Sequence, residues 1–424
     1  MNDNKIPYTQ NYMLSFDDAL QLITDHCTLL DTETIKLANC SGRILAEDII
    51  SPVSVPTFDN SAMDGYAVNF KDLTAAGPDN PVRLKLIGLT AAGDNIALPD
   101  KTNKTAWKIM TGAPLPKGYD SIIPVENTEL STEKNNVKCF SAPHYGAHVR
   151  SSGEDFVKHD VVLKDKQIIN ANRVMALASL GVAELKVVKK PCIAIFSTGK
   201  ELVDDPSIEL QPGQIYNSNM PYILEYLKEL PVVAYNAGTN YDEVELYQQA
   251  LQMELNKNTD IIISTGAVSM GDFDFIPQTI IKMGGEIIFH KSKIRPGKPI
   301  LFAKFPNGSY YFGLPGNPIS ATIGLRFFVT HLINLMIGMP KEKPLKAKIL
   351  NNQSKKKGFK KILKAHAKID LSANLIVEIS QGQESFKIHP MLDANGWVIL
   401  SETNKNTPTG ELVDFYFSNL DLNH

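Results

Sequence analysis

Cysteine is scarce in this sequence and follows no pattern. The four cysteines, Cys27, Cys40, Cys139 and Cys192, stand far apart among 424 residues, and no two form a Cys-x-x-Cys pair. This spacing indicates neither a zinc knuckle nor a disulfide framework. We therefore expect a protein of a reducing compartment, the cytoplasm.

A strong charge of either sign is also missing. Lys and Arg number 43 and Asp and Glu number 46, so the net charge is -3. Nothing in this total favours a polyanion, such as a nucleic acid, as the partner. Residues 355–361 are a local exception with five lysines. They could contact phosphates, but without an accompanying aromatic ladder they are more typical of a solvated turn.

Segments for export or membrane insertion are not evident. The first seven residues are polar and lack the apolar centre of a signal peptide. The only long apolar run, residues 319–338, is interrupted by Arg326, His331 and Asn334 and follows a Pro-Gly-Asn-Pro turn. It predicts a buried helix rather than a membrane span. We expect a soluble protein with no membrane partner.

Several familiar site motifs are absent as well. Neither Gly-x-Gly-x-x-Gly nor a Walker loop occurs. A calcium loop beginning at Asp59 fails, because Met63 and Asp64 fill its fifth and sixth positions. His144 and His148 are four apart, but the Pro and Gly around them indicate a loop rather than a metal-binding helix. No Ser-His-Asp or Cys-His signature is visible.

What is present is typical of a large globular enzyme. Hydrophobic residues make up 43% and charged residues 21% of the chain, which is long enough for several domains. Strand and helix patterns alternate from about residue 181, which predicts an α/β fold with a doubly wound, mostly parallel sheet. The expected domains are an elongated scaffold (15–50 with 150–180), a β-rich insertion (51–149), the α/β domain (181–340) and a small C-terminal β-barrel-like domain (341–424).

The most unusual stretch is residues 57–68, in which two carboxylates, an amide and two hydroxyls precede Gly65. Asp, Asn, Ser and Gly favour turns, so we expect an exposed loop. Exposed oxygen atoms of this kind are typical of sites that bind hard cations or oxyanions. The alternative is a turn whose side chains only cap their own backbone.

Three expected strands of the α/β domain end in small polar turns, at residues 196–201, 264–272 and 314–320. The carboxyl ends of parallel strands meet at one edge, where glycine turns expose N–H groups to anions. Lys291, Arg295 and Lys298 lie nearby in sequence and would add positive charge. A generic strand-to-helix turn explains any one of these segments, but together they indicate a site for phosphates or oxyanions.

Seven segments resemble, in this order, the molybdopterin molybdenumtransferase family, which includes the gephyrin E domain. They are residues 58–67, 110–114, 153–155, 197–199, 213–219, 296–299 and 313–318. The resemblance implies an enzyme of molybdenum cofactor biosynthesis that inserts molybdate into adenylylated molybdopterin, requires Mg2+ and releases AMP. It also implies a homodimer whose cleft is shared between subunits, with other proteins of cofactor biosynthesis as further partners.

The resemblance assigns roles residue by residue. Catalytic roles fall on Asp59, Thr111, Glu201 and Asp242, and Asp59, Glu201 and Asp242 would also ligate the metal. The resemblance and the strand-end turns together imply substrate contacts by Asp155, Ser197, Thr198, Gly199, Gly266, Ser269, Gly271, Asp274, Lys291, Arg295, Lys298, Pro315, Gly316, Pro318 and Ser320.

Three positions depart from the family pattern. Lys200, Met220 and Ala267 stand where the family usually has Asp, Arg and Gly, and each is expected at the predicted pocket. Two other functions therefore stay open. A molybdopterin adenylyltransferase resembles the same α/β domain but usually lacks the Asp59 segment and the C-terminal domain. A non-catalytic molybdopterin-binding scaffold would tolerate the three departures.

Overall fold

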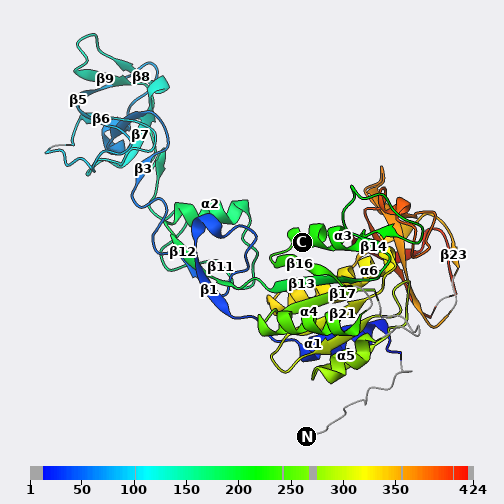
Figure 1. The fold of residues 1–424 in the computed structure, drawn as a ribbon. Coiled ribbons are helices and arrows are strands. Elements are labelled where there is room, and N and C mark those ends of the chain that lie inside the picture. Colours follow the sequence, from blue (N-terminus) through cyan, green and yellow to red (C-terminus); the bar gives the residue numbers. More distant parts are fainter. Residues whose placement is uncertain are drawn as a thin grey trace, which may run out of the picture. The chain divides into compact units, whose positions relative to one another are not determined.

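Figure 1 shows the computed structural model of the chain, which describes residues 13–100, 102–240, 243–266, 275–354, 357–403 and 405–418. The contacts divide the chain into two compact units. Unit 1 comprises Met1–Glu33, Gly42–Ile44 and Lys186–His424, and unit 2 comprises Thr34–Ser41 and Leu45–Leu185. Unit 2 is thus inserted into the sequence of unit 1. The expected division into four domains is finer than this one and stays a prediction.

A six-stranded sheet forms the centre of unit 2, in agreement with the β-rich character expected for residues 51–149. Its strand order is β7-β4-β6-β5-β9-β8, with β5 and β6 parallel and the other neighbours antiparallel. Tyr66, Leu84 and Val137 are buried in its core. The strands are β4 (Gly65–Val68), β5 (Val82–Thr90), β6 (Thr105–Ile109), β7 (Ser121–Pro124), β8 (Thr128–Leu130) and β9 (Asn136–Cys139).

The stretch 57–68 is not the single exposed loop that we expected. Asn60 and Ser61 form β3 (Asn60–Ser61), which pairs with β10 (Val149–Arg150), and both residues are buried. Residues 65–68 form the buried strand β4. The prediction was wrong because the pairing strands lie far away in the sequence, where local turn propensity cannot reveal them. Asp59 and Asp64 are exposed.

Shorter elements complete unit 2 and lead to unit 1. One of them is the helix α2 (Ala171–Ser179), and the side chain of its N-cap Asn170 accepts a hydrogen bond from Arg173 N. Two strand pairs are β2 (Ile49–Ile50) with β11 (Val161–Leu163) and β1 (Thr32–Lys36) with β12 (Glu184–Val188). Single 3-10 turns occur at Leu37–Asn39, Phe70–Leu73 and Val125–Asn127.

Unit 1 contains the α/β sheet expected from the alternating pattern. Its order is β16-β13-β17-β21-β20-β18, in which the first four strands are parallel and β20 and β18 are antiparallel to their neighbours. The sheet is therefore mixed but mostly parallel. The strands are β13 (Cys192–Thr198), β16 (Val233–Asn240), β17 (Ile261–Thr265), β18 (Glu286–His290), β20 (Leu301–Lys304) and β21 (Tyr310–Leu314).

Helices cover both faces of this sheet (Figure 1). On one face α4 (Val244–Asn256) and α5 (Ile276–Lys282) bury Leu251 and Ile280 against Tyr311 of β21. Phe312, which alternates with Tyr311, packs against Phe302 on the other face. That face also carries α1 (Phe16–His26), α3 (Asn219–Lys228), α6 (Pro318–Gly324), a π-helical turn (Leu325–Val329) and α7 (Thr330–Met336).

The last three of these segments form one helix, Pro318–Met336, as expected for the long apolar run. Among the described residues it is the one helix long and apolar enough to cross a membrane. However, 94% of its most apolar window is buried inside the protein. Phe16 of α1 packs edge-on against Phe327 and Phe328 of this helix. The helix is thus part of the core of unit 1.

The C-terminal part of unit 1 is a small β-barrel. β24 pairs with both β25 and β26, which closes the order β24-β25-β22-β28-β26 on itself. Leu363, Val377 and Phe415 lie in its core. The strands are β22 (Leu345–Ile349), β24 (Lys360–Ile369), β25 (Leu375–Ile379), β26 (Gly396–Leu400) and β28 (Leu412–Phe417), with a side pair β23 (Gln353–Ser354) and β27 (Asn406–Thr407) and a 3-10 turn at His389–Met391.

The lysine-rich stretch 355–361 is not simply a solvated turn. Lys360 and Lys361 begin β24 and pair in register with Ile294 and Arg295, which form β19 (Ile294–Arg295). The side chain of Lys360 is mostly buried and forms an ion pair with Asp17 (2.7 Å). The sequence pattern missed this because the pairing strand and the partner acid belong to distant segments.

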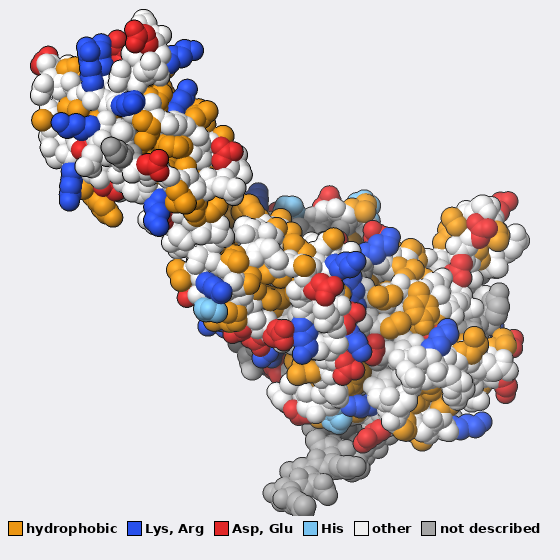
Figure 2. All heavy atoms as spheres, turned by 90° about the vertical axis from the view of Figure 1, so that its left-hand side faces the viewer, with side chains coloured by type: hydrophobic (Ala, Val, Ile, Leu, Met, Phe, Trp, Pro, Cys, Tyr) orange, Lys and Arg blue, Asp and Glu red, His pale blue; other side chains and the backbone are white. Residues whose placement is uncertain are grey.

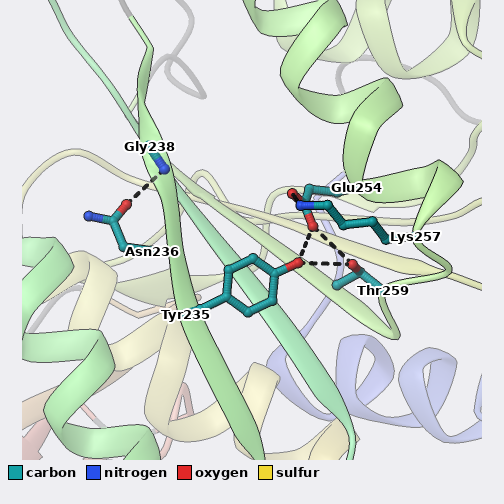
Figure 3. A network of polar contacts seen from close by, with 6 residues as sticks. All are labelled: Tyr235, Asn236, Gly238, Glu254, Lys257 and Thr259. Atoms are coloured by element: carbon teal, nitrogen blue, oxygen red, sulfur yellow. Dashed lines mark hydrogen bonds and ion pairs between the residues drawn. The ribbon is translucent and has the colours of Figure 1, made fainter.

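A polar network fastens the edge strand β16 to the end of α4 (Figure 3). The hydroxyl of Tyr235 and that of Thr259 (3.0 Å) both donate to the buried carboxylate of Glu254, which also pairs with Lys257 (2.7 Å). Residues 241–243 connect β16 to α4 in the sequence. The network therefore fixes β16 relative to α4, the two elements on either side of Asp242.

The surface carries charges of both signs. On the face in Figure 2, Lys and Arg side chains are interspersed with Asp and Glu and with hydrophobic side chains. This mixture agrees with the net charge of -3. It gives that face no field of one sign that would attract a polyanion.

Candidate functional site

Three neighbouring parallel strands end at one edge of the sheet of unit 1. β13 ends at Thr198, β17 at Thr265 and β21 at Leu314. The registers pair Thr265 with Ser197 on one side and with Leu314 on the other, so the three strand ends lie next to one another. The prediction that the three polar turns share a strand-end edge is confirmed. We call residues 197–201, 264–266 and 314–320 the strand-end rim.

The turns of the strand-end rim are in direct contact. Thr198 Oγ1 donates to Thr265 O (3.0 Å), and Gly266 N donates to Leu314 O (3.0 Å). Gly266 has φ +94°, and a Cβ there would lie 2.3 Å from Thr198 O. A Cβ on Gly316 would meet Gly266 Cα at 3.6 Å. The backbone of the rim is therefore close-packed, and only a residue without a side chain fits at position 266.

Two asparagines without a predicted role organise the same edge. Asn217 donates from Nδ2 to Ser197 Oγ (3.0 Å) and to Asp204 Oδ1 (2.8 Å), and its Oδ1 accepts Met220 N (3.2 Å). Asn219 donates to Gly316 O (2.8 Å). The motif at 213–219 was recognised, and its two asparagines at the start of α3 were the available signal.

The departures from the family pattern at positions 200 and 220 lie in different surroundings. Lys200 is exposed, next to Glu201, which is also exposed. A Cβ on Gly199 would lie 2.7 Å from Glu201 Oε1, so the Glu201 carboxylate lies over the Gly199 backbone. Met220 is buried in α3. Its side chain therefore belongs to the helix's packing.

The cationic segment 291–298 runs between the sheet and the barrel. Lys291 is buried, with φ +95°, and its N donates to Ile300 O (2.9 Å). Arg295 is exposed, and its guanidinium lies 4.5 Å from the ring centroid of Phe359. Lys298 is exposed. Two of the three predicted cations are thus open to an anion from solvent.

The turn after β21 leads into α6. Pro315 is buried and Gly316 exposed, while Pro318 is the first residue of α6 after the N-cap Asn317. Ile319 N donates to Ser385 O (3.0 Å), from the connection between β25 and β26. Ser320 is buried. Part of the rim is therefore held from the barrel side.

In unit 2, three of the resembling segments lie against one another. Gly112 N donates to Ser61 O (2.8 Å), and Ser61 N donates to Ala113 O (3.0 Å). Gly153 N donates to Pro56 O (2.9 Å) and Asp155 N to Val55 O (2.9 Å). Segments 58–67 and 110–114 therefore lie against each other, and segment 153–155 is bonded to the residues just before 58–67. Asp59, Thr111 and Asp155 belong to this one local cluster.

The side chains of this cluster have different tasks. Asp59 is exposed, and its Oδ1 accepts Ser152 N (2.8 Å). Asp64 Oδ1 accepts both the amide (2.7 Å) and the hydroxyl (2.9 Å) of Thr111, and these bonds lower the pKa of Asp64. The Thr111 hydroxyl is thus engaged by a carboxylate. Asp155 is exposed.

Some predicted residues lie outside the described ranges. They are Asp242, Ser269, Gly271 and Asp274, together with Ala267. Within the described residues, no group of three or more His, Cys, Asp or Glu side chains gathers. Asp59 belongs to unit 2 and Glu201 to unit 1. The predicted metal ligands therefore stay a prediction, although exposed carboxylates such as Asp59 and Glu201 are of the type that Mg2+ binds.

Comparisons with known families match both units. A family described as the MoeA N-terminal region (domain I and II) matches residues 14–181, and a family described as a probable molybdopterin binding domain matches residues 194–334. The second match contains the whole strand-end rim. The first contains the cluster around Asp59.

Curated relatives match most of the chain. Molybdopterin molybdenumtransferase of Staphylococcus aureus (strain MRSA252) is 33% identical over 409 residues, 95% of each chain. The Haemophilus influenzae protein of the same name is 33% identical over 95% of this chain and 98% of its own. That of Synechococcus elongatus is 36% identical over 76% of this chain and 80% of its own.

Solved structures agree. The crystal structure of a molybdopterin biosynthesis MoeA protein from Pyrococcus horikoshii covers 96% of this chain and 100% of its own, with a TM-score of 0.80 and 26% identity. A second structure of that protein gives a TM-score of 0.81 and 28% identity.

Proposed function

The chain belongs to the molybdopterin molybdenumtransferase family, and we propose that it inserts molybdate into adenylylated molybdopterin and releases AMP. Membership makes it an enzyme of molybdenum cofactor biosynthesis. The observation that carries the finer proposal is the strand-end rim, in which three close-packed glycine-bearing turns share one edge beside exposed cations.

The rim and the cationic segment would hold the substrate. Main-chain N–H groups at strand ends bind phosphate oxygens, and the N-terminus of a helix such as α6 adds a favourable dipole. Arg295 and Lys298 are exposed, and a Cβ on Gly297 between them would lie 3.5 Å from Ser320 O of the rim. The two cations would attract the phosphates and molybdate. Because Arg295 is stacked on Phe359, its guanidinium is held in place before an anion arrives.

The acidic residues would bind the metal ion, which in turn would assist the departure of AMP. When bound, Mg2+ neutralises charge on the pyrophosphate oxygens and so favours release of AMP. In this proposal Asp59, Glu201 and Asp242 hold the ion. Asp59 is suited because only its Oδ1 is engaged by Ser152 N, which orients the carboxylate and leaves its other oxygen for a ligand. Asp64, by contrast, is bonded to Thr111.

The proposal includes a cellular setting. We place the enzyme in the cytoplasm as a homodimer, working with other proteins of molybdenum cofactor biosynthesis. The four cysteines include no disulfide in this structure, which suits a reducing compartment.

The decisive experiment measures AMP release. Purified protein is incubated with adenylylated molybdopterin, Mg2+ and molybdate, and AMP is measured with and without molybdate. Asp59→Asn keeps the acceptor for Ser152 N but removes the charge, so we expect the fold to persist and AMP release to fall about 100-fold or more. Asp79→Asn, at an exposed turn of the same unit, is the matched control.

The outcomes separate the three functions. Molybdate-dependent AMP from the wild type, lost in Asp59→Asn, supports the proposal. Formation of adenylylated molybdopterin from ATP and molybdopterin would indicate the adenylyltransferase instead. Binding of molybdopterin without turnover by a folded, dimeric protein would indicate the scaffold.

A further inference from the structure

Lys364 is a buried lysine that has no role in the proposed reaction. It lies in β24 between Leu363 and Ala365, which both face the barrel core. Since side chains alternate along a strand, Lys364 points to the outside of the barrel. It is nevertheless 0% exposed. The connection between β25 and β26, which crosses β24, therefore covers it.

The ammonium of Lys364 binds main-chain oxygens of this connection. Nζ donates to Lys387 O (3.0 Å) and to Glu384 O (3.4 Å). Burial lowers the pKa of Lys364, while the nearby Glu384 carboxylate acts in the opposite direction. A buried ammonium is costly unless its hydrogens are bound. The two carbonyls stabilise the charge, and the charge in turn fixes the two carbonyls.

Gln383 ties the same connection to the backbone of Lys364. Its Oε1 accepts Lys364 N (3.0 Å), and its Nε2 donates to Lys364 O (2.9 Å) and Ser380 O (2.7 Å). In addition, Ser380 N donates to Lys364 O (3.0 Å). Residues 380–387 are therefore attached to one residue of β24 through both its side chain and its backbone.

The attached segment reaches the strand-end rim. Ser385 follows Glu384 directly and accepts a hydrogen bond from Ile319 N (3.0 Å). Ile319 lies in the first turn of α6, between Pro318 and Ser320. N–H groups in a first turn have no partner within their helix, so an outside acceptor fixes the turn's position.

We propose that Lys364 is a positioning residue for the molybdenumtransferase reaction, acting through Ser385 on the first turn of α6. It holds residues 384–387 in place, and these hold the turn whose Pro318 and Ser320 are predicted to contact substrate. Lys364 itself touches no substrate. The inference rests on the proposed function for its catalytic consequence.

The test compares three lysine variants. Lys364→Met keeps the length of the side chain but removes the ammonium, whereas Lys364→Arg keeps a cation with several donors. Lys368→Met is the matched control, because Lys368 lies on the same side of the same strand and is exposed. Two readouts are taken for each: amide hydrogen exchange of Ile319 in the substrate-free protein, and KM and kcat for molybdate-dependent AMP release.

For Lys364→Met we expect the amide hydrogen of Ile319 to exchange about tenfold faster, because one charge-assisted attachment of residues 384–387 is lost. We also expect KM for adenylylated molybdopterin to rise about tenfold with a smaller change in kcat. Lys364→Arg should recover part of both effects, and Lys368→Met should match the wild type. Wild-type exchange and kinetics in Lys364→Met, or equal effects of Lys368→Met, would overturn the proposal.

A second variant covers the case in which Lys364→Met does not fold, as judged by circular dichroism. Gln383→Leu removes three hydrogen bonds from the same segment but leaves the buried charge in place. Faster Ile319 exchange with raised KM supports the proposal, and wild-type values overturn it. Absence of AMP release from the wild type would instead sink the proposed function, and the exchange data would still test the attachment.

Discussion

Asp64 and Thr111 are joined by two hydrogen bonds, in which the amide (2.7 Å) and the hydroxyl (2.9 Å) of Thr111 donate to one carboxylate oxygen. This contact links two segments that resemble the family. It also distinguishes two acids of one motif. Asp64 holds two segments together, whereas Asp59 is exposed and accepts a hydrogen bond from Ser152 N.

The bond between Asp64 and Thr111 predicts a dependence of stability on pH. The pKa of Asp64 is lowered in the folded protein, so its contribution is present above its usual value of 3.8 and is lost as the pH falls further. We expect wild type and Asp64→Asn to differ in urea midpoint at pH 6 and to converge below pH 3.8.

This convergence can be followed in unit 2 alone. The chain has two tryptophans, so Trp107 fluorescence in a Trp397→Phe background reports on unit 2. Asp79→Asn should change the midpoint little at any pH. A difference between wild type and Asp64→Asn that stays constant down to pH 3 would contradict the interpretation.

The ion pair between the buried Arg326 and the partly exposed Glu342 predicts a large loss of stability when the glutamate is removed. Arg326 is 2% exposed and binds Glu342 through two bonds of 2.8 and 2.6 Å. Glu342→Ala leaves the guanidinium without its counter-charge and should lower the free energy of unfolding by about 3 kcal/mol. Urea unfolding followed by Trp397 fluorescence, in a Trp107→Phe background, measures it.

The exposed pair of Glu225 and Lys228 is the control for this measurement. Its geometry is similar, with a separation of 2.6 Å, but both side chains are mostly in solvent. Glu225→Ala should therefore cost less than about 0.5 kcal/mol. Equal losses for the two glutamate variants would show that burial does not set the strength of the Arg326 pair.

The lowered pKa of His331 predicts that the protein loses stability in mild acid. Burial, assisted by Lys341, lowers the pKa of His331 to about 4 from its usual 6.5. The neutral ring is thus favoured in the fold, so its contribution is complete above pH 6.5 and falls towards pH 4, by up to about 1.4 kcal/mol per pH unit. His331→Gln should remove this slope. An NMR titration of His331 with a midpoint near 6.5 would refute the assignment.

The close packing around Gly266 predicts that the strand-end rim tolerates no side chain at this position. In Gly266→Ala the new Cβ would lie 2.3 Å from Thr198 O, in addition to the strain of φ +94°. We expect a loss of at least about 2 kcal/mol together with loss of activity. Gly308 has the same φ of +94° with no atom within 4 Å, so Gly308→Ala should cost only about 1 kcal/mol. Similar losses in the two variants would mean that φ alone matters.

Local signals were sufficient for much of the fold. Ser15 and Asn170 cap α1 and α2 through their own side chains, which is chemistry that the sequence displays. The strand-end rim was also predictable, because apolar runs followed by Gly, Ser and Thr turns locate strand ends, and the alternation of strands and helices places those ends at one edge.

Long-range contacts account for what the sequence did not reveal. Asn60 and Ser61 are buried because β10 pairs with them, and Lys364 is buried because the connection between β25 and β26 crosses it. Neither partner is visible in the local pattern. Asn217 was missed for a similar reason, since its contacts with Ser197 and Asp204 depend on how the strand-end turns fold back.

The insertion of one unit within the other has a consequence for synthesis on the ribosome. Phe16 is translated long before its aromatic partners Phe327 and Phe328, because the whole inserted unit lies between them in the sequence. Residues 34–185 are already complete by then. The inserted unit can therefore fold first, while the apolar face of α1 stays uncovered until the helix Pro318–Met336 has been made.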